Sequence, residues 1–147
     1  MEADAQEAFR RISNLVTLGK VCEIKSDEGL ALARVELDGR VSDFLPVLLW
    51  NSDFVKVWMP IRIGQQVAVF FPFGEGDFGL VLPGIYHKGN REPGGANDGN
   101  VIVEIGGVRF ESDGADLRLK APGKIKIEAG GDIDIDGSTI HLNEEEI

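Results

Sequence analysis

The chain has 147 residues, of which 43% are hydrophobic, and 25 acidic against 15 basic residues give it a formal charge of −10. This length suffices for one ordinary domain with an appendage and excludes two full-sized domains. The negative charge opposes attraction to a phosphate backbone or an anionic membrane, so we do not expect nucleic acid as a partner.

Neither a disulfide framework nor a targeting segment is visible. A single cysteine, Cys22, excludes an intrachain disulfide and suits a reducing cytosol. The N-terminus carries charges throughout and lacks the apolar stretch of a signal peptide. The longest apolar runs, such as 46–50 and 67–72, fall far short of the ~20 residues that a membrane helix needs. We therefore expect a chain that is soluble when made.

Residues 1–17 predict a short N-terminal helix. Apolar residues recur there at steps of three and four, as on one face of a helix: Ala5, Ala8, Phe9, Ile12, Leu15 and Val16. We expect Gly19 to mark its end. A helix of about twelve residues is marginal by itself in water, so this one needs a partner surface.

Residues 18–89 predict a small five-stranded β barrel. Apolar runs at 21–24, 31–37, 44–49, 67–71 and 79–86 are separated by the turn sequences SDEG, DG and GEGDFG. Short strands of this number fit a closed OB-like barrel, because closure removes the exposed edges of an open sheet. An SH3-like barrel is the nearest competing fold. Residues 90–100 (NREPGGANDGN) combine Pro, Gly, Asn and Asp, which indicates a glycine-rich joint between two domains.

The second domain, residues 101–147, contains the most informative pattern. From Leu117 to Gly137 every odd position is apolar or small, and every even position is charged or turn-forming. This alternation predicts β structure over a run much longer than a mean strand of about 5–6 residues. A bulky-x-bulky motif recurs there every eight residues, as in the stacked rungs of a β-helix or prism: Leu117, Leu119, Ile125, Ile127, Ile133 and Ile135.

One chain supplies about three such rungs, with weaker ones at 101–105 and 108–110, and these are too few to enclose a core. The inward side chains therefore need copies of themselves from other chains. Closed cyclic symmetry makes three chains around a common axis a simple solution, so we expect a homotrimeric needle with the six bulky residues on its axis. The alternative is a flat two-sheet sandwich made by one chain.

Several short motifs follow one another along nearly the whole chain: GKV at 19–21, ARV at 33–35, DFLP at 43–46, VWMP at 57–60, GQQV at 64–67 and GLVLPGIY at 79–86. In this order they resemble the phage baseplate assembly protein V family, which includes the central tail spikes of contractile phages and of phage-tail-like bacteriocins. The resemblance implies a structural trimer, not an enzyme, in a virion or similar particle assembled in the bacterial cytoplasm. Its barrels would dock on the baseplate hub, and its needle would pierce the target outer membrane when the sheath contracts.

Family members often end in His-x-His, three copies of which gather an iron ion, whereas this chain has the single His141 near its end. If the eight-residue repeat continues, Thr139, His141 and Asn143 point inward. If the corner is one residue shorter, Ile140 and Leu142 point inward and His141 faces solvent. Burial of Ile and Leu favours the second register, so we expect no cofactor, with His141 as the one candidate ligand. The missing motif also makes a separate tip protein a plausible partner.

Aromatic residues are frequent in the barrel region, and OB folds use such residues to stack single-stranded bases. Because these aromatics are interleaved with apolar residues in an acidic chain, we interpret most of them as core or trimer contacts. The loop that carries Trp50, Phe54 and Trp58 is the expected hub contact. An OB-type module for nucleic acid or another ligand is the alternative function.

No catalytic pattern is present: the sequence lacks HExxH, a Walker sequence and a Ser-His-Asp order. A cell-wall hydrolase domain would need many more residues. The acids after Lys126 and the basic residues between Arg118 and Lys126 are interpreted as solvated faces, and the acids would also oppose aggregation of needles.

Overall fold

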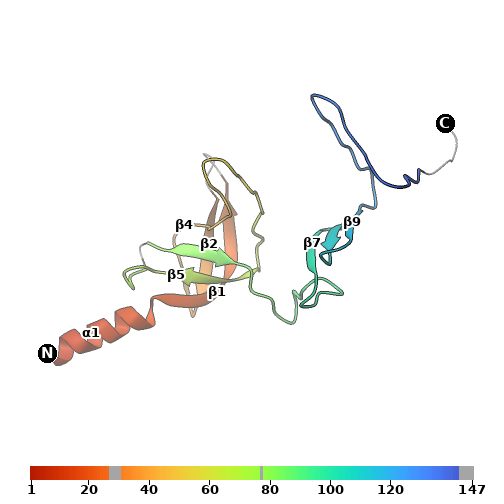
Figure 1. The fold of residues 1–147 in the computed structure, drawn as a ribbon. Coiled ribbons are helices and arrows are strands. Elements are labelled where there is room, and N and C mark those ends of the chain that lie inside the picture. The colour runs from red at the N-terminus through yellow and green to blue at the C-terminus, as the bar shows by residue number, and fades with distance from the viewer. Residues whose placement is uncertain (27–30, 77, 143–147) are drawn as a thin grey trace. The chain divides into compact units, whose positions relative to one another are not determined.

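The computed structural model describes residues 1–26, 31–76 and 78–142, and it is mainly β with one short N-terminal helix, as predicted (Figure 1). The chain divides into two compact units, Met1–Glu92 and Pro93–Ile147. No helix among the described residues is long and apolar enough to cross a membrane.

Helix α1 spans Glu2–Ser13, so the expected short helix is confirmed. It ends before Leu15 and Val16, which were expected on its apolar face, and Val16 instead begins the first strand. The Asn14 N–H donates to the Arg10 carbonyl at 3.1 Å and to the Arg11 carbonyl at 3.2 Å, which ends the helix. Acidic residues occupy the first turn and basic residues the last, and both placements suit the helix dipole.

Strand β1 (Val16–Lys25) organises the sheet of the first unit. Its first half, residues 16–20, pairs with β5 (Gln66–Phe70), and its second half, residues 20–25, pairs with β2 (Leu32–Leu37). All these pairings are antiparallel. The strand therefore changes its partner at Lys20.

Gly19 lies beside this change of partner, and the prediction that it ends the helix was wrong. A Cβ atom at Gly19 would lie 2.5 Å from the Glu36 carbonyl oxygen and 2.5 Å from Val35 Cγ1. Only a residue without a side chain allows β1 to approach β2 so closely. The glycine is therefore explained by packing between strands and not by helix termination.

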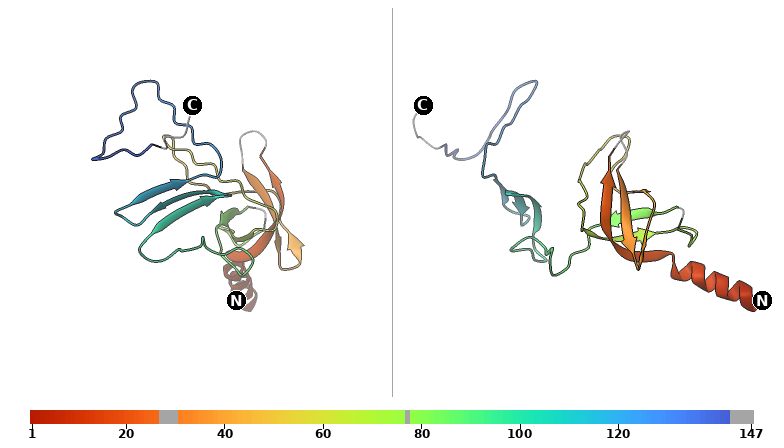
Figure 2. Two further views of the ribbon diagram at one scale, coloured as in Figure 1. Left: turned by 90° about the vertical axis from the view of Figure 1, so that its right-hand side faces the viewer. Right: turned by 180° about the vertical axis from the view of Figure 1, so that it is seen from behind.

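The remaining strands of this sheet are β3 (Arg40–Val41), β4 (Leu45–Pro46) and β6 (Leu80–Pro83). The sheet order is β3-β2-β1-β5-β6, and β4 also pairs with β2. Figure 2 shows the sheet from two further sides. As the DG sequence predicted, β2 and β3 are joined by a two-residue turn at Asp38 and Gly39, where φ is 33° and 83°.

The sheet does not close into the barrel that we expected. Between the described residues, β4 and β6 are linked through a single parallel bridge, Val47 to Val81, and the Leu48 N–H donates to the Val81 carbonyl at 2.9 Å. A continuous ladder does not form because β4 has only two residues and Pro46 has no N–H to donate. The unit is thus a curved sheet whose edges meet at one point.

Ten buried apolar side chains form the core inside this sheet: Val21, Ala33, Val35, Leu37, Leu45, Val47, Val67, Val69, Phe71 and Val81. Ser42 is a buried polar residue beside them. Its Oγ accepts the Val35 N–H at 2.9 Å and donates to the Asp43 carbonyl at 2.7 Å, so its burial leaves no unpaired polar atom.

The second unit contains an antiparallel sheet in the order β7-β8-β9, formed by Val101–Ile105, Val108–Ser112 and Leu117–Lys120. This corrects the interpretation of 101–105 and 108–110 as rungs of a β-helix. Gly106 and Gly107 form a two-residue turn that places Ile105 opposite Val108, so the chain returns at once as a hairpin.

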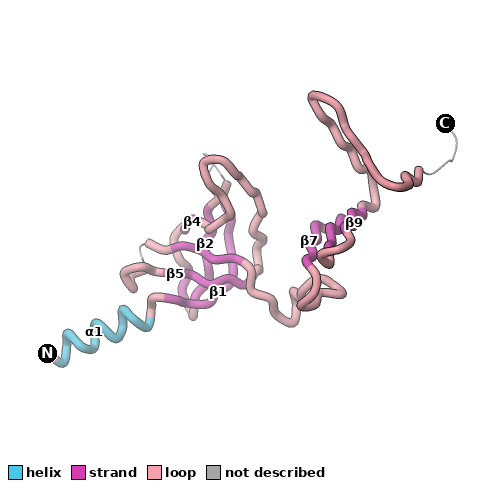
Figure 3. Tube along the Cα trace, in the orientation of Figure 1, coloured by secondary structure: helices cyan, strands magenta, loops and turns pink. Residues whose placement is uncertain are grey.

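Residues 121–142 form no strand, although the alternation predicted β structure as far as Gly137 (Figure 3). The physical reason is that a strand requires a neighbour for its backbone hydrogen bonds, and this single chain supplies none there. The trimeric β-helix therefore stays a prediction.

The close approach at Gly19 yields a stability test. We expect Gly19→Ala to lower the free energy of unfolding by about 1–3 kcal/mol, because the new methyl group must displace a backbone carbonyl. Gly76→Ala is the matched control, since its Cβ would meet only Arg40 Nη1 at 3.5 Å. Thermal unfolding followed by circular dichroism measures both, and equal stability of the two variants would contradict the packing role of Gly19.

Candidate functional site

The sheet of the second unit exposes an apolar face. Its register places seven large apolar side chains on one side: Val101, Val103, Ile105, Val108, Phe110, Leu117 and Leu119. All of them are exposed, from 38% for Val108 to 71% for Ile105. Exposed apolar area costs about 25 cal/mol per Å² relative to burial, so a continuous face of this kind indicates a contact surface.

The opposite face of this sheet is satisfied within the chain. Arg109 forms ion pairs with Glu111 at 3.0 Å and with Glu104 at 3.1 Å, and its guanidinium donates to the Gly94 carbonyl at 2.8 Å. The hydrogen bond with Glu111 is the main cause of the raised pKa of Arg109. Polar pairing thus identifies this face as the solvent side, and the described residues supply no cover for the apolar face.

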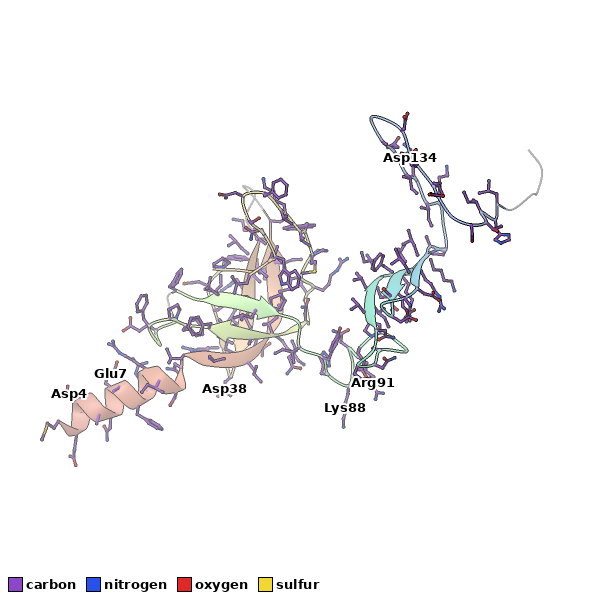
Figure 4. All side chains as sticks on the ribbon, in the orientation of Figure 1. Asp4, Glu7, Asp38, Lys88, Arg91 and Asp134 are labelled. Carbon is purple, nitrogen blue, oxygen red and sulfur yellow. The ribbon has the colours of Figure 1, made fainter. Side chains whose placement is uncertain are left out.

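The segment 121–142 continues from β9 and exposes both its apolar side chains and its backbone. Ile125 and Ile127 are 50% and 69% exposed, and Ile133 and Ile135, eight residues later, are 51% and 69% exposed. Among the described residues, no backbone group of this segment bonds to another backbone group. Figure 4 shows Asp134 on the same segment, between Ile133 and Ile135 in sequence. A backbone whose N–H and C=O groups have no partner can pair with another strand.

The six predicted axis residues are all exposed and lie on one continuous stretch of chain. Leu117 and Leu119 belong to β9, and the four isoleucines follow it. The structure brings the two leucines onto one sheet face with Phe110 and Val103, which the sequence interpretation missed. The alternation of apolar and polar residues within 101–105 and 108–112 was the signal that could have revealed this shared apolar face. The position of these residues on a symmetry axis stays a prediction.

The loop from Trp50 to Trp58 is held by its own hydrogen bonds. The Val57 N–H donates to the Trp50 carbonyl at 3.1 Å, and the Ser52 N–H donates to the Val55 carbonyl at 2.7 Å. Ser52 Oγ accepts the Phe54 and Val55 N–H groups at 3.3 and 3.0 Å. The loop displays Phe54 at 96% exposure, with Trp50 and Trp58 also exposed. It is therefore an ordered turn that presents aromatic rings to solvent.

The candidate ligand His141 is exposed, as are Ile140 and Leu142 on either side of it. Within the described part of the chain, no three His, Cys, Asp or Glu side chains are grouped to hold a metal ion. His141 is the single imidazole of residues 101–147, which does not match the donor set of a His-x-His site. Asn143 and the acids Glu144, Glu145 and Glu146, which entered the interpretation of this end, lie outside the described residues.

Comparison with known proteins finds one distant similarity. No family model matches this sequence. The chain is 27% identical over 133 residues to the Spike protein of Escherichia phage P2, and the match covers 89% of this chain and 62% of that protein. The chain therefore spans less than two thirds of the length of this relative, to which it is distantly related.

Helix α1 carries an ion-pair network that gives a pH test. Hydrogen bonds from Arg10 and Arg11 lower the pKa of the Glu7 carboxyl from 4.5 to about 2. A carboxyl whose pKa is depressed in the folded state stabilises that state above its ordinary pKa. Its contribution is therefore fully present above pH 4.5 and is lost as the pH falls towards 2.

We expect the helical circular dichroism signal to decrease over this acid range and the decrease to be smaller in Glu7→Gln. Salt should weaken the same contribution, because the pairs are exposed to solvent. Glu2→Gln is the control, since Glu2 lies on the same helix outside the network. An acid transition unchanged by Glu7→Gln would contradict the role of these pairs.

Proposed function

We propose that this chain is the central spike of a contractile phage-type tail, a homotrimer with a C-terminal needle built from residues 101–147. The distant relationship to a phage Spike protein supports a tail spike role. The observation that carries the proposal is the segment 121–142, in which apolar or small residues alternate with charged or turn-forming ones as far as Gly137 and which has no backbone partners among the described residues.

Three copies would give this segment both partners for its backbone hydrogen bonds and cover for its apolar side chains. Each chain offers its free backbone groups to the next, and cyclic closure leaves no strand edge exposed. The leucines and isoleucines of the six-residue axis set turn to the centre, where copies of the same residues surround them. The even-numbered residues, such as Lys124, Lys126 and Asp134, remain in water on the outside.

The sheet β7–β9 extends the same arrangement towards the N-terminus. Its apolar face includes Leu117 and Leu119, which lead directly into the isoleucine rungs. Three such faces around one axis would enclose Phe110 and the valines of β7 in a shared core. The needle would then begin as packed sheets and continue as an intertwined β-helix.

This architecture explains a mechanical function without catalysis. A needle that pierces a cell envelope must be stiff, narrow and resistant to unfolding. Backbone hydrogen bonds between chains supply stiffness, and the small residues between the rungs, such as Ala121, Gly123 and Gly131, keep the corners narrow. In this proposal sheath contraction supplies the work, and the spike needs no cofactor.

The first unit is proposed to dock on the baseplate hub through the loop that carries Trp50, Phe54 and Trp58. Aromatic side chains are enriched in the cores of protein interfaces, and they bury a large area at low cost in side-chain entropy. The internal hydrogen bonds of the loop keep this surface ordered before it binds. At the other end, Ile140 and Leu142 are proposed to point inward and His141 outward, with a separate tip protein as a further partner.

Oligomeric state tests the proposal. Light scattering should give about 48 kDa, three times the chain mass of 16.0 kDa. Ile127→Asp should dissociate the trimer or lower its thermal midpoint strongly, because it places three carboxylates in an apolar centre. Lys126→Asp is the matched control one position away and should stay trimeric. A monomeric parent chain, or equal effects of the two variants, would contradict the needle.

A second assay separates the spike from an OB-type binding module. We expect a labelled single-stranded oligothymidine to show no retention with the parent protein at low salt, because the charge of −10 repels phosphates. Retention that Phe54→Ala abolishes would instead assign base stacking to the aromatic loop.

A further inference from the structure

The sheet of the first unit is apolar on its outer face as well as its inner face. Across β1, β5 and β6, the registered rows Val16–Phe70–Leu80 and Leu18–Ala68–Leu82 lie on the side opposite the core. Their neighbours along the strands, Val67, Val69 and Val81, are buried within the core. We call the six residues of the two rows the outer patch.

The outer patch is accessible in the single chain. Val16 and Leu18 are each 58% exposed, and Phe70 and Leu82 are also exposed. An antiparallel sheet with one solvated face ordinarily carries polar residues on that face. Two apolar faces therefore indicate that something covers the outer patch.

Helix α1 has an apolar face that also lacks a partner. Helical spacing places Ala5, Ala8, Phe9 and Ile12 on one side, with Glu7, Arg10 and Arg11 on the other. No residue of the helix is buried, and Phe9 is 73% exposed. A helix of this length gains most of its stability from packing such a face.

The helix is anchored to its own chain by its polar side. Arg11 forms an ion pair with Glu75 at 3.1 Å, and Gly74 passes so close that a Cβ there would collide with the Arg11 carbonyl oxygen. The Phe71 N–H donates to the Leu15 carbonyl at 2.8 Å just beyond the helix. Two residues, Asn14 and Leu15, separate α1 from β1. With this short link and anchor, α1 projects away from the sheet (Figure 1) and does not fold back over it.

We infer that α1 of each copy packs its apolar face on the outer patch of the next copy, an inference that rests on the proposed trimer. One contact covers both unpartnered surfaces. Because it joins two different surfaces head to tail, a threefold rotation closes it into a ring. The contact would add an interface around the first unit to the interface along the needle.

The dimensions of the outer patch suit a helix of this length. Twelve helical residues span about 18 Å, and a helix about 10 Å across matches the width of roughly 10 Å that three strands present. Ala8 on the helix and Ala68 on the central strand are small enough for close approach. Beyond Leu18 the outer face ends at Lys20, which is registered opposite Glu36 and Gln66, so polar residues mark the border of the outer patch.

Disulfide cross-linking of the full chain tests the inference. Ala8→Cys and Ala68→Cys are introduced together in a Cys22→Ser background, and the protein is oxidised under mild conditions. We expect covalent dimers and trimers on a non-reducing gel, since a disulfide forms where Cα atoms come within about 4.4–6.8 Å. The matched control replaces Ala8→Cys by Ala3→Cys, on a different side of the helix, and should give little cross-linking.

The results of cross-linking and light scattering together distinguish the helix contact from the needle. A trimer by light scattering with no cross-link between chains, or with a link inside one chain, would overturn the helix contact and leave the proposed spike intact. Equal cross-linking by Ala3→Cys would overturn it as well. A monomeric parent chain would overturn both. As a second measurement, Phe9→Asp should lower the thermal midpoint of the trimer more than Gln6→Asp does.

Discussion

Backbone hydrogen bonding is the constraint on which the rest of this protein depends, because every N–H and C=O removed from water needs a partner. The strands β1 to β6 and β7 to β9 meet this requirement within the chain. Residues 121–142 form no backbone–backbone hydrogen bond among the described residues, and from residue 122 on they are exposed to water. The assembly proposed for this protein follows from the difference, since a second chain would let the apolar side chains of this segment leave water with their backbone groups paired.

Apolar surface points to the same conclusion independently of the hydrogen bonds. The core of the first unit consists of ten side chains, whereas the outer patch, the helix face and the β7–β9 face all lie outside it. Solvation of so much apolar surface opposes a stable monomer. The proposed contacts among copies would bury these surfaces with the residues already present.

Charged side chains play a different role from the apolar surfaces. Ion pairs such as Arg109 with Glu111 and Arg10 with Glu7 hold polar faces in order, and they mark which side of each element faces water. Exposed pairs of this kind add little stability by themselves. In the proposed needle, the acidic residues along 128–136 would give neighbouring particles a common sign, which opposes side-by-side association.

The sequence by itself determined the short helix, most strands of the first sheet, the turn at Asp38 and Gly39, and the alternation after Leu117, because each depends on residues near one another in the chain. The hairpin at Gly106 is also local, and its two-glycine turn was a signal in the sequence. Tertiary structure alone decided the role of Gly19 and the open barrel. These features depend on which distant strand lies alongside, and periodicity shows which way a side chain faces without showing what it meets. For the same reason the alternation as far as Gly137 predicted strands but could not show which backbone they would pair with.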